Sequence, residues 1–268
     1  SISGNGMPGI LWEILAHRPL SIQNYRYFWC YIVDHLQHFD YNRLMEAKYL
    51  IRLTGITFGY NGKPLLFDSL DFFLPENCRI GIIGPNGCGK TTLLNIIMGF
   101  VKPMSGVIEI FGAEMKGEKD FQKARRLIGF LFQNSDDQLF CPSVKEEVAF
   151  GPLNYRLPKE EVERRVKKSL ELVGLEKFEA MAPYRLSEGE KKKLAIATIL
   201  AMQPKILLLD EPTNGLDEEG VKRVVSILNS KKFTYAIISQ DINFLKQTTE
   251  KIYTIENGRL VEVNLHSH

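Results

Sequence analysis

From residue 49 onward, short apolar runs alternate along the chain with longer amphipathic segments. The short runs have the length and composition of buried strands, and the longer segments repeat their apolar residues at helical spacing. We predict strands in residues 49–60, 64–74, 78–84, 106–112, 126–133, 205–210, 233–239, 249–256 and 258–263, and helices in residues 93–100, 143–182, 191–203 and 218–229. Strands that alternate with helices imply an α/β fold with a mainly parallel sheet, which binds ligands at the carboxyl ends of its strands.

Residues 1–48 differ from the rest of the chain and hold both tryptophans. Between residues 21 and 46 apolar side chains recur at helical spacing, which predicts an amphipathic helix. These side chains are Ile22, Tyr25, Trp29, Ile32, Leu36 and Phe39. An exposed aromatic stripe would be adhesive, so we expect this N-terminal extension to pack on the rest of the chain or on a partner.

The composition narrows the class of protein. Of the 268 residues, 44% are hydrophobic, which is enough for one large domain or a domain with a subdomain. The net charge of +2 gives no reason to expect a nucleic-acid partner. The cysteines lack the spacing of a metal site or a disulfide framework. Neither a membrane-spanning run nor a signal-peptide pattern is found, so we expect a cytoplasmic protein.

A glycine-rich stretch, GPNGCGKTT, occupies residues 84–92 between a predicted strand and a predicted helix. This order is the context of a phosphate-binding loop, in which backbone N–H groups and a helix N-terminus surround a polyphosphate. Lys90 is expected to reach the β- and γ-phosphates, and the Thr91 hydroxyl to ligate Mg²⁺. The other nucleotide contacts predicted in this loop are Gly84, Asn86, Gly87, Cys88, Gly89 and Thr92. The sequence therefore predicts a nucleoside triphosphate site.

Two adjacent carboxylates end the apolar run KILLLDE at residues 205–211. Asp210 suits the coordination shell of Mg²⁺, directly or through water. Glu211 is placed to orient and polarise an attacking water molecule. Next to a phosphate-binding loop, this pair predicts hydrolysis of the bound nucleotide.

Two further motifs are Gln133, at the end of a predicted strand, and LSEGE at residues 186–190. With them the chain resembles the ATP-binding cassette (ABC) family over residues 49–263. The resemblance implies a cassette in residues 49–265 that binds ATP and Mg²⁺. Its expected parts are a RecA-like core with a mainly parallel sheet, an antiparallel β subdomain, and a helical subdomain at about residues 136–188.

The resemblance also implies a role for individual residues. Tyr60 matches the aromatic residue that stacks on adenine. Gln133 matches the glutamine that senses Mg²⁺ and the attacking water, so the expected metal ligands are Thr91, Gln133 and Asp210. Ser187 and Gly189 match the signature motif, which contacts the γ-phosphate held by a second subunit. Asp217 matches the loop through which the two subunits communicate.

The stretch NSDDQLFCPSVKEEVAFGPLNYRL after Gln133 resembles the cobalt and energy-coupling-factor branch of the family. This implies the ATPase subunit of an importer for a vitamin or a transition-metal ion, peripheral on the inner face of the cell membrane. The implied partners are a second ABC ATPase subunit, an integral membrane scaffold protein and a substrate-binding membrane subunit, with no nucleic acid.

The same stretch suggests how the chain contacts a partner. Phe140, Val144, Val148 and Phe150 are expected to line a groove that receives a partner's helix, with acidic residues at its rim. The alternative is that these apolar residues pack the helical subdomain.

The chain departs from its family at two motifs. Gln240 replaces a histidine; it can hydrogen-bond the γ-phosphate but cannot become cationic, and with Glu211 and Gln133 it completes the predicted catalytic group. In LSEGE, Glu188 and Glu190 bring negative charge toward a phosphate unless Lys191, Lys192 and Lys193 offset it. These departures favour pairing with a related, non-identical cassette over a homodimer.

Two other functions remain open at this point. One is a soluble ABC-type ATPase in nucleic-acid repair or translation, which usually carries a long coiled-coil insertion or a second cassette, neither of which is present here. The other is a regulatory nucleotide-binding module with weak turnover, suggested by Gln240 and the altered signature. Glu211 argues against it, because a purely regulatory site needs no water-polarising carboxylate.

Overall fold

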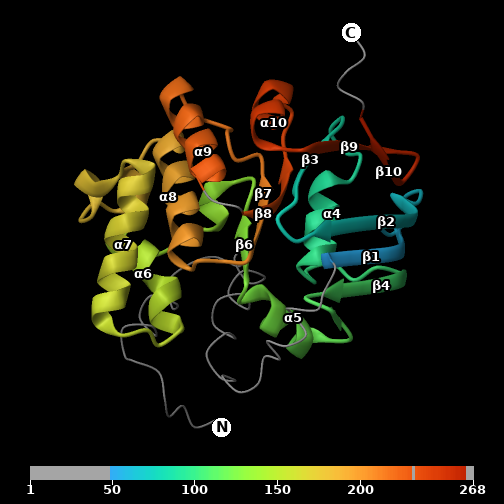
Figure 1. The fold of residues 1–268 in the computed structure, drawn as a ribbon, viewed down its shortest axis with the longest axis horizontal. Coiled ribbons are helices and arrows are strands. Elements are labelled where there is room, and N and C mark those ends of the chain that lie inside the picture. The colour runs from blue at the N-terminus through green and yellow to red at the C-terminus, as the bar shows by residue number, and fades with distance from the viewer. Residues whose placement is uncertain (1–48, 231–232, 264–268) are drawn as a thin grey trace.

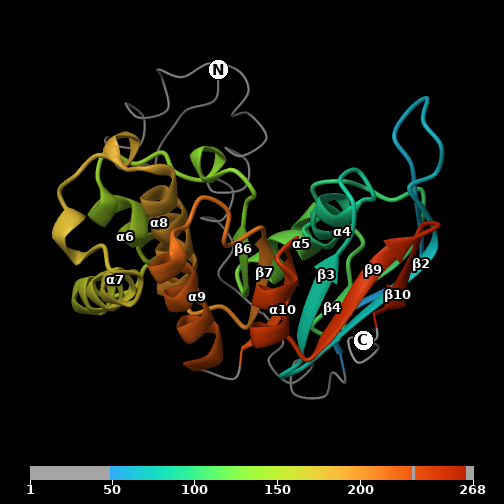
Figure 2. The ribbon, with the colours of Figure 1, turned by 90° about the horizontal axis from the view of Figure 1, so that it is seen from above.

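The computed structural model describes residues 49–230 and 233–263. The amphipathic helix predicted within residues 21–46 lies outside these ranges. In Figures 1 and 2 a central parallel sheet separates a group of helices, α6 to α9, from the antiparallel strands β1, β2 and β4.

A six-stranded sheet with the order β10-β9-β3-β8-β7-β6 forms the centre of the described region. Its strands are β3 (Arg79–Ile83), β6 (Ile128–Leu131), β7 (Ile206–Asp210), β8 (Thr234–Ile238), β9 (Lys251–Glu256) and β10 (Arg259–Glu262). All neighbouring pairs are parallel except β10 and β9. The prediction of a mainly parallel sheet is therefore confirmed, and the carboxyl ends of β3, β6, β7 and β8 meet at one edge.

A second, antiparallel sheet has the order β2-β1-β4-β5. Its strands are β1 (Tyr49–Phe58), β2 (Phe67–Pro75), β4 (Ser105–Ile110) and β5 (Ala113–Glu114). Along β2, buried and exposed side chains alternate from Leu70 to Leu74, as expected for a sheet with one solvated face. Its buried face joins α4 (Lys90–Ile97) and one face of the parallel sheet in a common hydrophobic core.

The central strands are apolar throughout because both of their faces are covered. In β7, Ile206 and Leu208 belong to the core shared with α4, whereas Leu207 and Leu209 belong to a second core on the opposite face. This alternation explains the uninterrupted run ILLLD. The second core is built with the helices α6 (Val144–Asn154), α7 (Lys159–Val173), α8 (Glu188–Ala201), α9 (Glu218–Ser230) and α10 (Ile242–Thr248).

The charged stretch predicted as helical, residues 143–182, contains two helices, α6 and α7, and one short 3₁₀ turn at Glu176–Phe178. In α7 the buried residues Val162, Val166, Leu170 and Val173 follow helical spacing, and Gly174 ends the helix in the left-handed conformation. The pattern did not predict α5 (Glu118–Arg125) or α10. The boundaries of 49–265 for the cassette and 136–188 for the helical subdomain stay predictions.

Candidate functional site

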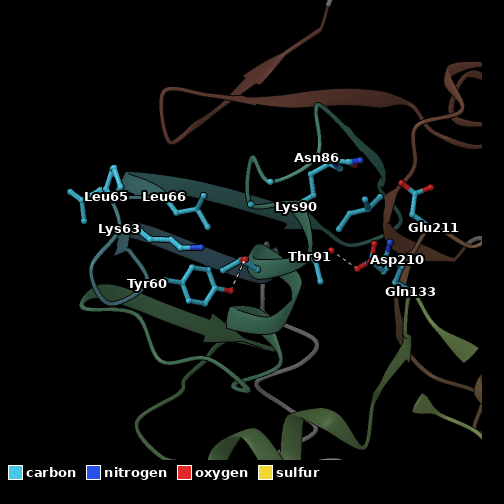
Figure 3. A pocket seen from close by; sticks show the side chains of 15 residues that line it. Tyr60, Lys63, Leu65, Leu66, Asn86, Lys90, Thr91, Gln133, Asp210 and Glu211 are labelled. Atoms are coloured by element: carbon cyan, nitrogen blue, oxygen red, sulfur yellow. Dashed lines mark hydrogen bonds between the residues drawn. The ribbon is translucent and has the colours of Figure 1, made fainter. Parts of the chain in front are cut away.

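A cavity of about 670 Å³ opens at the carboxyl edge of the parallel sheet (Figure 3). It is lined by Tyr60, Lys63, Pro64, Leu65, Leu66, Asn86, Gly87, Gly89, Lys90, Thr91, Thr92, Gln133, Asp210, Glu211 and Ile238. In Figure 3, Tyr60 and Lys63 lie at one end, and Gln133, Asp210 and Glu211 lie at the other. The cavity therefore joins an aromatic end to an acidic end across the glycine-rich loop.

The glycine-rich loop connects β3 to α4 and can fold only because of its glycines. Gly89 has φ of 109°, and a Cβ atom there would lie 2.7 Å from the ring of Phe67. The Lys90 ammonium donates hydrogen bonds to the backbone oxygens of Gly84 at 2.6 Å and Pro85 at 2.9 Å. These carbonyls hold the ammonium against the loop, beside the N-terminus of α4, where a polyphosphate binds.

Thr91 and Asp210 come from different elements and meet directly. The Thr91 hydroxyl donates a 2.7 Å hydrogen bond to Asp210 Oδ2. Burial raises the pKa of Asp210, while the Thr91 hydrogen bond and the ammonium groups of Lys192 and Lys90 lower it. Together with Gln133, this is an oxygen donor set on one side of the cavity. Such a set fits Mg²⁺, which takes one or two protein ligands beside phosphate oxygens and water.

Glu211 follows β7 in a left-handed backbone conformation with φ of 48°. This conformation is unfavourable for a non-glycine residue and is typical of functional sites. Burial raises the pKa of the Glu211 carboxyl, and the negative charge of Asp210 raises it further. The backbone N–H of Gln240 donates a 3.4 Å hydrogen bond to Glu211, which lowers this pKa and partly opposes the rise. A raised pKa is what a carboxylate needs to take a proton from water near neutral pH.

The side chains of Gln240 and Asn86 connect β8 with the glycine-rich loop. Gln240 Nε2 donates to Asn86 Oδ1 at 2.6 Å. Gln240 therefore contacts the phosphate loop through its side chain and Glu211 through its backbone. The sequence named both Gln240 and Asn86 as site residues but gave no sign that they touch.

Tyr60 is held at the aromatic end of the cavity. Its hydroxyl and the Thr92 hydroxyl share a 3.0 Å hydrogen bond, and its ring meets that of Phe58 edge-on at 5.0 Å. The side chain is still 46% exposed, which leaves a ring face for a base to stack on. Sequence reasoning missed Lys63 and the apolar residues that follow it, although their place in the loop after Tyr60 was a usable signal.

Ser187, Gly189 and Asp217 lie away from the cavity and do not line it. Ser187 caps α8: its hydroxyl accepts from the Glu190 backbone N–H and donates to the Glu190 carboxylate at 2.8 Å. A Cβ atom on Gly189 would lie 2.6 Å from the backbone oxygen of Gly215. One chain thus presents two separate groups of predicted site residues.

The three lysines after the signature act differently from one another. Lys191 pairs with Glu188 at 3.2 Å and with Asp136 at 2.8 Å. Lys192 is buried, and Lys193 lies 3.8 Å from Asp217. The three lysines therefore do not offset the acidic signature equally. Lys191 alone of the three pairs with Glu188, and Glu190 is occupied in capping the helix.

The predicted groove is also wrong in part. Val144 and Val148 are 0% exposed and belong to the core between the parallel sheet and the helices, so they cannot line a groove. Glu147, on the same helix, is buried, and its carboxylate accepts hydrogen bonds from the backbone N–H groups of Phe140 and Cys141.

Phe140 and Phe150 are the two residues of the predicted groove that remain partly exposed. Their rings meet at right angles with centroids 4.9 Å apart. The structure therefore leaves a small aromatic surface where a groove was expected.

This fold and site define a P-loop ATPase of the ATP-binding cassette class. The family model described as ABC transporter matches residues 67–214. The chain therefore belongs to the ABC transporter family, as a transport-coupled ATPase.

Two relatives show how far the similarity extends. The chain is 40% identical to the energy-coupling factor transporter ATP-binding protein EcfA of Methanocaldococcus jannaschii over 218 residues, 80% of this chain and 78% of the relative. It is 46% identical to a putative ABC transporter ATP-binding protein of Nitratidesulfovibrio vulgaris over 211 residues, 78% of this chain and 77% of the relative.

Two solved structures share the fold. One is cbiO1 from Clostridium perfringens, described as part of the ABC transporter complex cbiONQ, with a TM-score of 0.71, 32% identity and coverage of 80% of this chain and 88% of that one. The other is the dimeric post-hydrolysis state of the cassette MJ0796 bound to ADP and Pi, with a TM-score of 0.72, 28% identity and coverage of 81% and 100%. Within the part of the chain that the structure describes, no helix combines the length and apolar character needed to cross a membrane.

Proposed function

We propose that this chain is the ATP-hydrolysing subunit of an energy-coupling-factor-type importer for a vitamin or a transition-metal ion. It works opposite a second cassette subunit, on an integral membrane scaffold that carries a substrate-binding membrane subunit, at the inner face of the cell membrane. The names of EcfA and cbiO1 support the class of importer. The transported compound is bound by another subunit, so nothing in this chain selects it.

The separation of Ser187 and Gly189 from the cavity carries the proposal of a dimer. The cavity supplies the phosphate loop and the catalytic carboxylate, and the signature residues lie outside it. A second chain, placed with its signature over this cavity, completes the site. The solved cassette MJ0796, which is described as dimeric with ADP and Pi bound, supports the proposal that this chain forms a dimer.

Within one cavity each residue has a distinct task in hydrolysis. Tyr60 stacks on adenine, and Lys90 and the loop N–H groups bind the β- and γ-phosphates. Thr91, Asp210 and Gln133 would hold Mg²⁺, and the ion would supply positive charge next to the phosphate oxygens. Glu211 orients the attacking water and takes its proton, and the Gln240 amide exchanges its bond to Asn86 for one to the γ-phosphate.

Two features favour a non-identical partner. Gln240 lacks the charge of histidine, and the Ser187 hydroxyl already donates to Glu190. A homodimer carries both features in each composite site. If the partner cassette has the histidine and an unmodified signature, each composite site of the heterodimer contains either Gln240 or the altered signature, but not both.

The dimer is tested with Glu211→Gln, which removes the base but keeps the side-chain volume. With ATP and Mg²⁺ this variant should form a stable dimer on gel filtration, alone or with the partner cassette, and should not hydrolyse ATP. Lys90→Ala is the control, because loss of its ammonium abolishes tight binding and should leave a monomer. A Glu211→Gln variant that hydrolyses ATP at the parent rate overturns the assignment of the base.

The importer is tested by purification of the tagged chain from its native membrane. A co-purifying integral membrane scaffold and a second cassette support it. Recovery with ribosomes or DNA instead would support the nucleic-acid alternative.

A further inference from the structure

We propose that Lys192 is a positioning residue that ties the signature helix α8 to the loop carrying Gln133, so that the two move as one unit. Because Ser187 and Gly189 at the start of α8 face the partner's nucleotide, this tie connects the partner's site with the Gln133 of this chain's own site. The inference rests on the proposed dimer.

The contact is made by a buried ammonium. Lys192 is 3% exposed, and its Nζ atom donates to the backbone oxygen of Gln133 at 2.7 Å and of Phe132 at 3.3 Å. Both acceptors are main-chain groups at the end of β6, where the Gln133 side chain enters the cavity. Lys192 therefore fixes the backbone from which Gln133 projects.

A second tie between the same two segments comes from the opposite direction. Gln138, also buried, accepts from the backbone N–H of Phe132 at 3.3 Å. Its Nε2 atom donates to the Ala195 backbone oxygen and the Thr198 hydroxyl of α8, both at 3.0 Å. The peptide groups next to Gln133 are thus bonded to α8, directly or through Gln138, on both their donor and acceptor sides.

The start of α8 is rigid enough to transmit a displacement. The capping box of Ser187 and Glu190 closes its first turn, and Lys192 follows within the next turn. Gly189 and Gly215 are in close backbone contact, so the same helix end also meets the loop before Asp217. A shift of the signature when a partner's ATP binds is therefore passed to Gln133 through one short stretch of helix.

Burying the Lys192 ammonium costs desolvation free energy, and nearby negative charges and two hydrogen bonds to backbone carbonyls offset this cost. Burial lowers the pKa of Lys192, and the charges of Asp210, Glu211 and Glu188 raise it. The negative charges of Asp210 and Glu211 therefore favour the charged form of Lys192. An apolar residue of similar length would pack as well and avoid the desolvation penalty, but it would leave the two carbonyls without a donor.

The test compares Lys192→Met, Lys192→Arg and Lys192→Gln in the full chain, with its partner cassette where one is needed for activity. Methionine keeps the length and removes the donor; arginine and glutamine keep a donor. Lys192→Met should lower kcat about 10–100-fold, the loss expected when a catalytic group is misplaced by about 1 Å. KM for ATP should stay within about threefold, because the adenine and phosphate contacts are intact. Arginine or glutamine should restore most of the rate.

Two further measurements separate positioning from general support of the fold. Lys168→Met removes an exposed lysine of α7 and should leave kcat unchanged. In the Glu211→Gln background, Lys192→Met should still form the ATP-dependent dimer, since the signature is untouched.

Three results would overturn the proposal: a kcat of Lys192→Met close to that of the parent, loss of the ATP-dependent dimer, or equal loss of rate in all three variants. Failure of the proposed dimer itself would look different. Glu211→Gln would then remain monomeric with ATP while Lys192 is intact.

Discussion

The side chain of Gln240 donates a 2.6 Å hydrogen bond to Asn86, which joins the end of β8 to the glycine-rich loop. In the ATP-binding cassette family this position normally holds histidine. The amide is therefore already paired with a loop residue before any γ-phosphate competes for it. Replacement of Gln240 therefore tests whether this residue limits the rate of ATP hydrolysis.

Gln240→His should raise the ATPase rate of the chain assayed alone. A histidine can become cationic beside the γ-phosphate, and one such electrostatic contact is worth roughly 10²–10³ in rate. Gln240→Asn, which keeps an amide at this position and adds no charge, is the matched comparison and should not raise the rate. Steady-state kcat is the measurement. Full activity of the parent chain alone, unimproved by Gln240→His or by any partner cassette, would remove the case for a heterodimer.

Replacement of Tyr60 should separate stacking from hydrogen bonding. Tyr60→Ala removes the ring and should weaken ATP binding about 5–150-fold, the range that corresponds to base–aromatic stacking energies of about 1–3 kcal/mol. Tyr60→Phe keeps the ring and loses only the bond to Thr92, so its affinity should stay close to that of the parent. Equilibrium titration with ATP measures both. Equal losses in the two variants would mean that the hydroxyl, rather than stacking, holds the nucleotide.

Gly189→Ala should impair assembly without impairing nucleotide binding by the monomer. Alanine favours helix, so the cost comes from the added Cβ atom, which would lie 2.6 Å from the Gly215 oxygen and displace the loop. In the Glu211→Gln background we expect about tenfold less ATP-dependent dimer, which corresponds to about 1.4 kcal/mol. Gly117→Ala is the control, since no atom lies within 4 Å of a Cβ there. An unchanged amount of ATP-dependent dimer would show that the loop at Gly215 can move to accommodate the added Cβ atom without impairing assembly.

Glu161→Gln should lower stability at neutral pH but not in acid. Hydrogen bonds from Arg164 and Arg165 lower the pKa of Glu161 to about 2. A carboxyl with a folded-state pKa below its unfolded value stabilises the protein above the unfolded pKa, and this contribution is lost as pH falls through the folded pKa. Because the ion pairs of Glu161 with Arg164 and Arg165 lie at the surface, the expected decrease in melting temperature is small, about 1–2 °C.

Thermal melts from pH 7 down to about pH 2, at low and high salt, measure this change. The difference between Glu161→Gln and the parent should shrink as the pH falls through the lowered pKa, and also in 1 M salt, where surface charges are screened. A difference that persists unchanged in acid would point to lost packing of the side chain instead.

The sequence by itself determined those parts of the nucleotide site whose residues are adjacent in the chain. The glycine-rich loop with Lys90 and Thr91, and the pair Asp210 and Glu211 at the end of an apolar run, are local patterns whose strand and helix context could be predicted from periodicity. The parallel sheet followed from the alternation of strands and helices, because a parallel connection needs a crossover segment. α10 escaped prediction because it is too short to establish a period.

Only the tertiary structure decided which distant residues meet. Tyr60 with Thr92, Gln240 with Asn86, and Lys192 with the Gln133 backbone are contacts between segments far apart in the chain, and no periodicity encodes them. The error at Val144 and Val148 has the same origin. The sequence shows that α6 has an apolar face that must be covered, but it does not show whether a partner or the protein's own helices cover it. In the structure α7 and α8 cover this face.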